Sequence, residues 1–427
     1  MCRSSRHTES TVSKSTLWAV YDNTYFIIKK ERVNMKLSTL TETLEFKLIQ
    51  GTMDKDVEAL IYFSDKAVQD CAFFAIAGAR KDGYCFIEDA VTRGARTVIL
   101  DQSHQGQALD DLRKRLFDDV TILQVDDVRI ALAIMSRNFF GRPCEEMIVI
   151  GVTGTKGKTS TTYMIKEILE AGGIKTGLIG TVENGFKGHM EEAEHTTPMS
   201  YEIQKWCRRM KDAGCKAVVM EVSSQGLMQY RVEGITFDLG IFTNISPDHI
   251  GEGEHKDFEE YLYWKSTLFK KCKTAIMNID DPNWRNILGD HVPENLITFG
   301  YDPKADYHIN HCRLLSRKGF LGLRYMINGQ RIHLNIPGTF NSLNSAGAIA
   351  AARCLGVDWR RIKTVLREIK IRGRVERVEI GKDFTILVDY AHNGVALERL
   401  LTSLRNYGPK RLLVVFGCGG NLSLIHI

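Results

Sequence analysis

The 427-residue sequence lacks several features that assign many proteins to a class at sight. Its ten cysteines include no CxxC pair, so neither a structural zinc site nor a disulfide framework is indicated. No run of 18 apolar residues is present, which removes the simplest form of a membrane-spanning helix. The formal net charge of +5 is too small and too dispersed to favour a nucleic-acid partner. These absences favour a cytoplasmic enzyme with reduced thiols and without membrane insertion.

The sequence also lacks internal repeats and low-complexity segments, and its length predicts two to three domains. Apolar segments of strand length alternate with helical patterns, which predicts an α/β fold with a central, mostly parallel sheet and helices on both faces. The central strands are expected at Met147–Val152, Ala217–Met220, Leu239–Thr243 and Thr274–Asn278. We expect an extension at 1–34, an N-terminal domain at 35–124, a central domain at 125–372 and a C-terminal domain at 373–427.

The C-terminal domain has an unusual pattern. Phe384–Asp389 and Arg411–Phe416 read as strands of a Rossmann-like unit, and a glycine turn at Gly417–Gly420 follows the second. Because no helix follows that turn, we expect an incomplete domain, with residues 421–427 foreign to it. A chain of this kind would bind its substrates but fail at a reaction that requires closure of the third domain.

The segment Val152–Ser160 reads VTGTKGKTS, between a predicted strand and a helix that begins near Thr159. A strand, a glycine loop and a helix N-terminus in this order direct backbone N–H groups at a phosphate. Lys158 would reach the outer phosphates, and the hydroxyl of Thr159 would hold Mg²⁺. The full pattern has a glycine where this chain has Val152, so the loop follows a shorter form.

Other chemical groups follow strands of the same predicted sheet, whose carboxyl ends share one edge. Glu221 and His249 come after two of these strands, although a histidine in a loop is often without function. Lys265 falls on one helical face with apolar neighbours at the helical spacing, namely Phe258, Leu262 and Phe269. A lysine there is paired with an opposite charge, lowered in pKa or chemically altered, or it extends its ammonium to solvent at the edge of the stripe.

Taken together, eight ordered motifs resemble the Mur ligases of bacterial cell-wall synthesis, from about Met35 to Gly420. The motifs are TGTKGKTS, His195–Pro198, Glu221–Leu227, Asn244–His249, Lys265, Gly338–Asn341, Arg372–Glu376 and Asp389–His392. The branch most similar adds the third amino acid to the stem peptide. The resemblance implies a three-domain architecture and a monomer that uses ATP and Mg²⁺.

The resemblance also implies roles for individual residues. It implies metal ligands at Thr159, Glu221, His249 and Lys265, the last as a carbamate. ATP contacts are implied at Gly154, Thr155, Lys156, Gly157, Lys158, Thr159, Ser160, Asn341, Asn344, Arg374, Asp389 and His392. Contacts to UDP-MurNAc-L-Ala-D-Glu are implied at Ser64, His195, Thr196, Thr197, Ser223, Gln229 and Arg231. Around Ser64 the family's Asp-Ser-Arg reads Phe63–Asp65, so this contact departs from the pattern.

The implied reaction forms an acyl phosphate on the D-Glu γ-carboxylate, which the amine of a diamino acid then attacks. Lys158, Glu221, His249 and Lys265 are the expected catalytic residues, and no protein nucleophile is required. The third residue is left open between L-lysine, meso-diaminopimelate and a rarer amino acid. Two alternatives are a folylpolyglutamate synthetase-like ligase, which shares the loop chemistry, and a non-catalytic nucleotide-binding protein.

Overall fold

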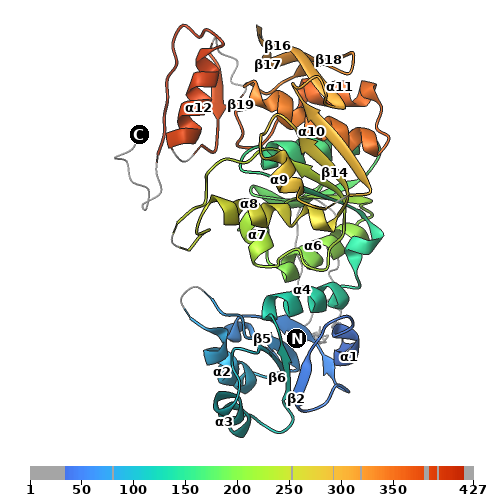
Figure 1. The fold of residues 1–427 in the computed structure, drawn as a ribbon, viewed down its shortest axis with the longest axis vertical. Helices are drawn as coiled ribbons and strands as arrows, with labels where there is room; N and C mark the ends of the chain where they lie inside the picture. Colours follow the sequence, from blue (N-terminus) through green and yellow to red (C-terminus); the bar gives the residue numbers. More distant parts are fainter. Residues whose placement is uncertain are drawn as a thin grey trace, which may run out of the picture.

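The computed structural model describes most of the chain, with short gaps. The described residues are 34–78, 81–251, 253–291, 293–317, 320–378, 384–391 and 394–417. The predicted extension, apart from residue 34, and the residues 421–427 lie outside them. Among the helices of these ranges, none is both long enough and apolar enough to cross a membrane. Two units are built around separate sheets, and a smaller C-terminal segment follows them (Figure 1).

The N-terminal unit contains a five-stranded sheet in the order β2-β7-β6-β5-β4. Its strands are β2 (Lys47–Gln50), β4 (Ala59–Ile61), β5 (Cys71–Phe74), β6 (Ala95–Asp101) and β7 (Thr121–Val125). All neighbours are parallel except β2 and β7. Four helices supply apolar side chains to its two faces, α1 and α4 to one face and α2 and α3 to the other. They are α1 (Leu37–Leu40), α2 (Ile87–Thr92), α3 (Gln107–Arg115) and α4 (Val128–Phe139). A short pair of β1 (Met35–Lys36) and β3 (Asp56–Val57) completes the unit.

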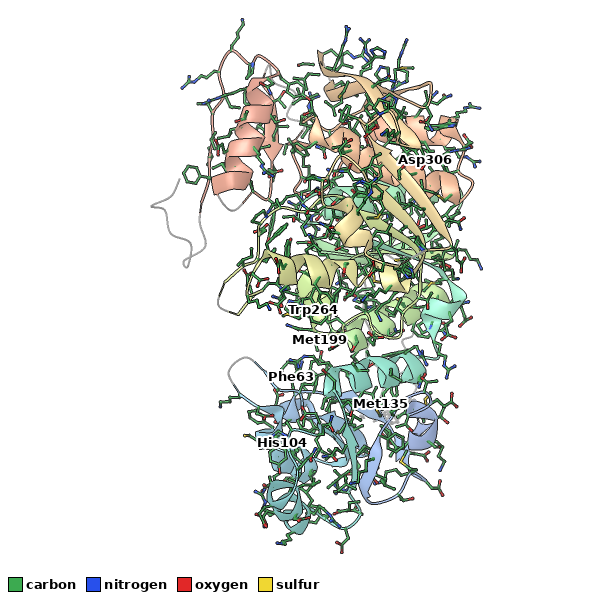
Figure 2. The ribbon with its side chains drawn as sticks, in the orientation of Figure 1. Phe63, His104, Met135, Met199, Trp264 and Asp306 are labelled. Carbon is green, nitrogen blue, oxygen red and sulfur yellow. The ribbon has the colours of Figure 1, made fainter. Side chains whose placement is uncertain are left out.

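Helix α4 connects the N-terminal unit to the rest of the chain. Asp127 caps its N-terminus, because the carboxylate accepts the backbone N–H of Arg129 at 2.6 Å. The apolar face of the helix, including Leu132 and Met135, is buried against the N-terminal sheet. We therefore propose that the N-terminal unit continues through α4 to Phe139, beyond the boundary expected at residue 124. Figure 2 shows Met135 on the N-terminal side of this junction and Met199 on the opposite side.

The central unit is built on an eleven-stranded sheet in the order β11-β10-β9-β12-β8-β13-β14-β15-β16-β17-β18. Neighbours from β9 to β16 are parallel, and antiparallel strands extend both ends. The parallel strands are β9 (Thr176–Ile179), β12 (Ala217–Glu221), β8 (Ile148–Thr153), β13 (Phe237–Phe242), β14 (Cys272–Asn278), β15 (Asn295–Gly300) and β16 (Tyr307–Arg317). The antiparallel strands are β10 (Glu183–Phe186), β11 (His189–Glu192), β17 (Phe320–Ile327) and β18 (Gln330–Leu334). The predicted α/β class and mostly parallel central sheet are confirmed.

Helices cover both faces of this sheet, since successive strand residues point to opposite sides. In β8, Ile150 faces a core with α5 and α10, and Val149 faces a second core with α6. The first face is covered by α5 (Lys158–Ala171), α10 (Phe340–Cys354) and α11 (Trp359–Glu368). The second face is covered by α6 (Ser200–Asp212), α7 (Ser224–Met228), α8 (Phe258–Ser266) and α9 (Trp284–Leu288). Both faces of the central sheet are thus buried, which is consistent with the continuous apolar sequence of the central strands.

The C-terminal segment begins with β19 (Glu376–Val378), which pairs antiparallel with β20 (Ile386–Val388). Strand β20 lies inside the predicted strand Phe384–Asp389 and is shorter than expected. Helix α12 (Gly394–Arg405) follows and lies beside β19 in Figure 1. The hydroxyl of Tyr407 donates to the Gly322 carbonyl at 2.8 Å, which ties this segment to the central sheet.

The strand predicted at Arg411–Phe416 is wrong. Residues 411–417 form neither strand nor helix, and the side chains of Leu413 and Val415 are 70% and 99% exposed. A β-strand requires a hydrogen-bonded neighbour, and within the described residues neither β19 nor β20 pairs with this segment. An apolar sequence alone therefore does not make it a strand.

Candidate nucleotide and substrate site

The glycine loop lies where the sequence places it, between the end of β8 and the start of α5. Two of its glycines are required by their backbone and their surroundings. Gly154 has φ +147°, and a Cβ there would lie 2.0 Å from the Thr243 hydroxyl. Gly157 has φ +90°, and a Cβ there would lie 2.2 Å from Oδ1 of Asn344. Neighbouring residues therefore pack closely around the loop. The loop continues directly into the N-terminus of α5, so its backbone N–H groups lie next to that helix end.

Contacts from the segment after β13 hold the loop in place. The N–H of Thr155 donates to the Asn244 carbonyl at 2.8 Å, and the N–H of Lys156 donates to Asn244 Oδ1 at 3.1 Å. In return, the hydroxyl of Thr243 donates to the Lys156 carbonyl at 2.7 Å. Lys156 also forms an ion pair with Asp248 at 2.8 Å. These contacts hold the loop against the segment after β13, while Val152, at the position of the missing glycine, is buried within β8.

The ammonium group of Lys158 folds back over the loop. Its Nζ donates to the carbonyls of Gly154 and Thr155 at 2.8 and 3.1 Å. Burial lowers the pKa of Lys158, and the nearby carboxylate of Glu221 opposes that shift. The Lys158 amine therefore lies against the loop, and its contact with the outer phosphates of a nucleotide stays a prediction.

Glu221 is buried at the end of β12 and collects hydrogen bonds from two neighbouring segments. Its carboxylate accepts from the Thr159 hydroxyl at 3.1 Å. It also accepts from the N–H and the hydroxyl of Thr181 at 2.8 and 3.0 Å. Thr181 was missed by the sequence reading, although it follows β9 at the same carboxyl edge of the sheet. Hydroxyl and carboxylate oxygens are the ligands that Mg²⁺ prefers, so Thr159 and Glu221 fit this ion in chemistry.

His249 lies in the loop after β13 with φ +55°, a left-handed conformation that is uncommon outside glycine. Its ring nitrogen Nδ1 lies 3.0 Å from Glu254 Oε1, and its ring centroid lies 6.2 Å from that of Tyr261. Within the ranges that the structure describes, no three His, Cys, Asp or Glu side chains form a metal cluster. The structure thus brings Thr159 and Glu221 into contact, while His249 is engaged with Glu254.

Lys265 is fully buried in α8, as its place on an apolar stripe predicted. Its Nζ donates to the Gly154 carbonyl at 3.0 Å and lies 4.6 Å from the ring centroid of Tyr261. Burial lowers the pKa of Lys265 well below its usual value, and the charge of Lys158 adds to this effect. The amine thus points at the phosphate loop, and the alternative of a lysine reaching solvent is wrong.

The predicted apolar stripe around Lys265 is confirmed, although it continues past the end of α8. Phe258 and Leu262 are partly buried against the same core in which Phe269, just beyond the helix, is completely buried. The predicted stripe did not include Tyr261, four residues before Lys265, which is completely buried within α8. Residues four apart share one helix face, so this spacing was the signal that could have identified Tyr261.

A second polar cluster lies beside Glu221 and contains the predicted substrate residues. The hydroxyl of Thr197 donates to the backbone carbonyl of Glu221 at 2.9 Å and lies 3.0 Å from the Ser223 hydroxyl. Arg231 donates to the Thr197 carbonyl at 2.6 Å and to Gln229 Oε1 at 2.7 Å. Residues from three separated motifs therefore converge at one place.

The remaining predicted substrate residues lie in two places. The hydroxyl of Thr196 lies 3.1 Å from that of Thr181, next to the Glu221 carboxylate, and His195 is exposed beside it. Ser64, in the N-terminal unit, hydrogen-bonds the Asp89 carboxylate and thereby lowers the pKa of that carboxyl group. Ser64 is thus engaged within its own unit rather than with the Thr197 cluster.

The residues expected to contact adenosine also lie in separate places, some at the loop and some away from it. Asn344 reaches the loop at Gly157, and its Nδ2 donates to Asn341 Oδ1 at 2.9 Å. Arg374 donates to the Thr159 hydroxyl at 3.1 Å, which links the C-terminal segment to the phosphate loop. The carboxylate of Asp389 instead accepts backbone N–H groups from Val375 and Ala391, both at 2.8 Å. His392 lies outside the described residues.

Comparisons with known proteins agree over most of the chain. The model of the Mur ligase middle domain matches residues 152–352, and that of the Mur ligase glutamate ligase domain matches 373–424. A UDP-N-acetylmuramoyl-L-alanyl-D-glutamate–2,6-diaminopimelate ligase of Clostridium perfringens is 38% identical over 396 residues, 91% of this chain and 78% of the relative. Its counterpart in Clostridium tetani is 37% identical over 390 residues, with the same shares. A solved structure of a ligase of this name shares the fold with a TM-score of 0.73 at 23% identity, over 91% of this chain and 78% of that one.

Proposed function

Because this chain belongs to the Mur ligase family, we propose that it is an ATP-dependent ligase of peptidoglycan synthesis. It joins the amino group of a diamino acid to the D-Glu residue of UDP-MurNAc-L-Ala-D-Glu in the cytoplasm. One observation carries the proposal. The side chain of Glu221 contacts Thr159 of the phosphate loop, while its backbone carbonyl accepts from Thr197 of the substrate cluster. One residue therefore joins the phosphate end of the nucleotide site to the place where a carboxylate substrate would lie.

The reaction requires charge neutralisation and alignment more than a protein nucleophile. The γ-carboxylate of D-Glu attacks the γ-phosphate of ATP, which gives an acyl phosphate and ADP. The amine of the diamino acid then attacks the acyl carbon, phosphate leaves, and the amine loses a proton. Lys158 offsets the charge of the outer phosphates, and the backbone N–H groups at the N-terminus of α5 orient them. Arg231 and Ser223 hold the peptide end of the substrate.

Mg²⁺ would be held by the oxygens of Thr159 and Glu221, where it supplies a positive charge beside the phosphates. His249 and a carboxylated Lys265 are the further ligands that we propose. Carboxylation requires a neutral amine, and the burial of Lys265 favours that form. Asn341 and Asn344 are the adenosine contacts that we propose, whereas Arg374, which donates to Thr159, would lie nearer the phosphates.

We propose 2,6-diaminopimelate as the amino acid. The relatives from Clostridium perfringens and Clostridium tetani, at 38% and 37% identity, are named as 2,6-diaminopimelate ligases, which supports this choice. L-Lysine is the competing amino acid, because it carries the same reacting amine and differs by one carboxylate.

The test is ligation by the purified chain. It is incubated with Mg·ATP, UDP-MurNAc-L-Ala-D-Glu and either meso-diaminopimelate or L-lysine, and the product is identified by mass spectrometry. Binding of the UDP-MurNAc-dipeptide is expected whether or not turnover follows. A tripeptide product with meso-diaminopimelate, with phosphate release that depends on both co-substrates, would support the proposed function and contradict the failure expected of an incomplete C-terminal domain. Thermal shift with the UDP-MurNAc-dipeptide and with dihydrofolate provides a control that is independent of turnover. Stabilisation by the folate alone would contradict the proposal and support the folylpolyglutamate alternative.

A further inference from the structure

Tyr261 contacts the phosphate loop from helix α8, although no motif of the sequence identifies it as part of the site. Its side chain is fully buried in α8, and its hydroxyl lies 3.0 Å from the Thr155 hydroxyl. The ring of the same residue lies 4.6 Å from Nζ of Lys265. Nζ in turn donates to the carbonyl of Gly154 at 3.0 Å. One helix face thus reaches two consecutive residues of the loop.

The direction of the Tyr261 hydrogen bond follows from the other contacts of Thr155. The Thr155 hydroxyl accepts the N–H of Ser246 at 3.0 Å and lies 3.2 Å from the Ser246 carbonyl. A carbonyl only accepts, so the single proton of Thr155 is directed there and Tyr261 donates to Thr155. Without this bond the phenol proton would be buried without a partner, which is costly.

Surrounding side chains hold the tyrosine ring in this orientation. The imidazole of His255 is buried, and its centroid lies 5.3 Å from that of Tyr261. The ring centroid of Phe258, in the same helix, lies 6.4 Å from that of Tyr261. Neither ring nitrogen of His255 has a hydrogen-bond partner among the described groups, so this ring contributes packing to Tyr261 rather than polar contacts. Packing of this kind leaves the phenol oxygen little freedom to move away from Thr155.

The loop from Gly154 to Gly157 has no helix or strand of its own, so contacts of this kind fix its position. We propose that Tyr261 is a positioning residue that fixes the phosphate loop at Thr155 and holds the Lys265 amine against Gly154. The inference rests on the proposed nucleotide site, and it adds a residue that acts through the loop without touching the substrate. Nucleotide affinity therefore depends on the Tyr261 hydroxyl, and the placement of Lys265 depends on its ring.

Equilibrium binding of Mg·ATP to the whole chain, by isothermal titration calorimetry, tests the hydroxyl. Tyr261→Phe removes one hydrogen bond and keeps the ring, so we expect Kd to rise about three- to tenfold. Tyr263→Phe is the matched control, since Tyr263 lies in the same helix and is 51% exposed. It should bind like the wild type. Thr155→Val removes the acceptor, and Tyr261→Phe added to it should cause no further loss.

Tyr261→Leu tests the ring, with ¹³C-bicarbonate and NMR as a readout of Lys265 carboxylation. We expect the carbamate signal of the wild type to persist in Tyr261→Phe and to be lost in Tyr261→Leu. Melting curves of every variant establish that it is folded before binding is compared. Wild-type affinity in folded Tyr261→Phe, or additive losses in the double variant, would overturn the inference while the nucleotide site stands. A wild-type chain that fails to bind Mg·ATP would overturn the proposed function and the inference with it.

Discussion

Replacement of Gly157 by alanine tests whether the loop is held as tightly as its contacts indicate. The backbone has φ +90° there, and the new Cβ would lie 2.2 Å from Oδ1 of Asn344. Gly173 provides a matched control just beyond the other end of α5, with φ +85° and no atom within 4 Å of a Cβ. The two variants share the backbone cost and differ in the clash.

The expected magnitudes follow from these two terms. A left-handed alanine costs about 1–2 kcal/mol, so Gly173→Ala should lose about that much stability. Gly157→Ala should lose about 1–3 kcal/mol more, because Asn344 is buried and bonded to Asn341 and has little room to move. If the shift displaces one loop N–H from a phosphate oxygen, Mg·ATP binding should weaken about ten- to a hundredfold. Gly173→Ala should bind as tightly as the wild type.

Urea unfolding followed by circular dichroism gives the two stabilities, and the midpoints are compared because the chain has more than one unit. Isothermal titration with Mg·ATP gives the affinities. The same midpoint in both variants, together with wild-type affinity in Gly157→Ala, would refute the close wrapping of the loop by Asn344.

Three further outcomes are expected. Lys158→Ala should abolish measurable Mg·ATP binding in calorimetry, whereas Lys156→Ala, whose side chain is exposed, should retain most of it; equal losses would contradict the role of Lys158. Burial depresses the pKa of Lys265 well below 10.5, so the unfolded chain binds the extra proton and stability should rise with pH from the folded pKa up to 10.5. In thermal melts in bicarbonate-free buffer, the Lys265→Met variant should show a smaller rise of stability with pH than the wild type. The same rise in both proteins would contradict the assignment of this pH dependence to Lys265. Arg231→Ala should weaken binding of UDP-MurNAc-L-Ala-D-Glu in calorimetry and leave Mg·ATP affinity unchanged; a loss of both would assign Arg231 to the fold rather than to the substrate.

The sequence predicts the phosphate loop and its neighbours well because parallel strands impose their geometry. Once β8, β12 and β13 are adjacent and parallel, the residues that follow them share one edge. The contact between Thr159 and Glu221, 62 positions apart, is a direct consequence of that arrangement. The lysine at 265 was predictable for a different reason, since a cation at an apolar helical position is unusual in any fold.

The parts that were missed depend on packing between elements rather than on local pattern. Tyr261 reads as one more apolar residue of a helix. Its spacing of four from Lys265 places it on the same helix face, but the contact of its hydroxyl with Thr155 depends on how α8 packs against the loop. The position of α4 is a second example, because its packing against the N-terminal sheet is a tertiary contact that the boundary expected at residue 124 did not include. The segment 411–416 shows the converse case, since its strand-like sequence has no neighbour to pair with among the described residues.

The carbonyl of Gly154 explains why the two lysines of the site differ in chemistry. It accepts from Nζ of Lys158 at 2.8 Å and from Nζ of Lys265 at 3.0 Å. Two ammonium groups on one buried oxygen repel each other, so one of them is driven toward the neutral amine. Lys158 has the carboxylate of Glu221 to support its charge, while Lys265 is more deeply buried and is further discharged by Lys158. Lys265, whose pKa is lowered further, is therefore the lysine for which we propose carboxylation, and Lys158 is the one for which we propose contact with the phosphates.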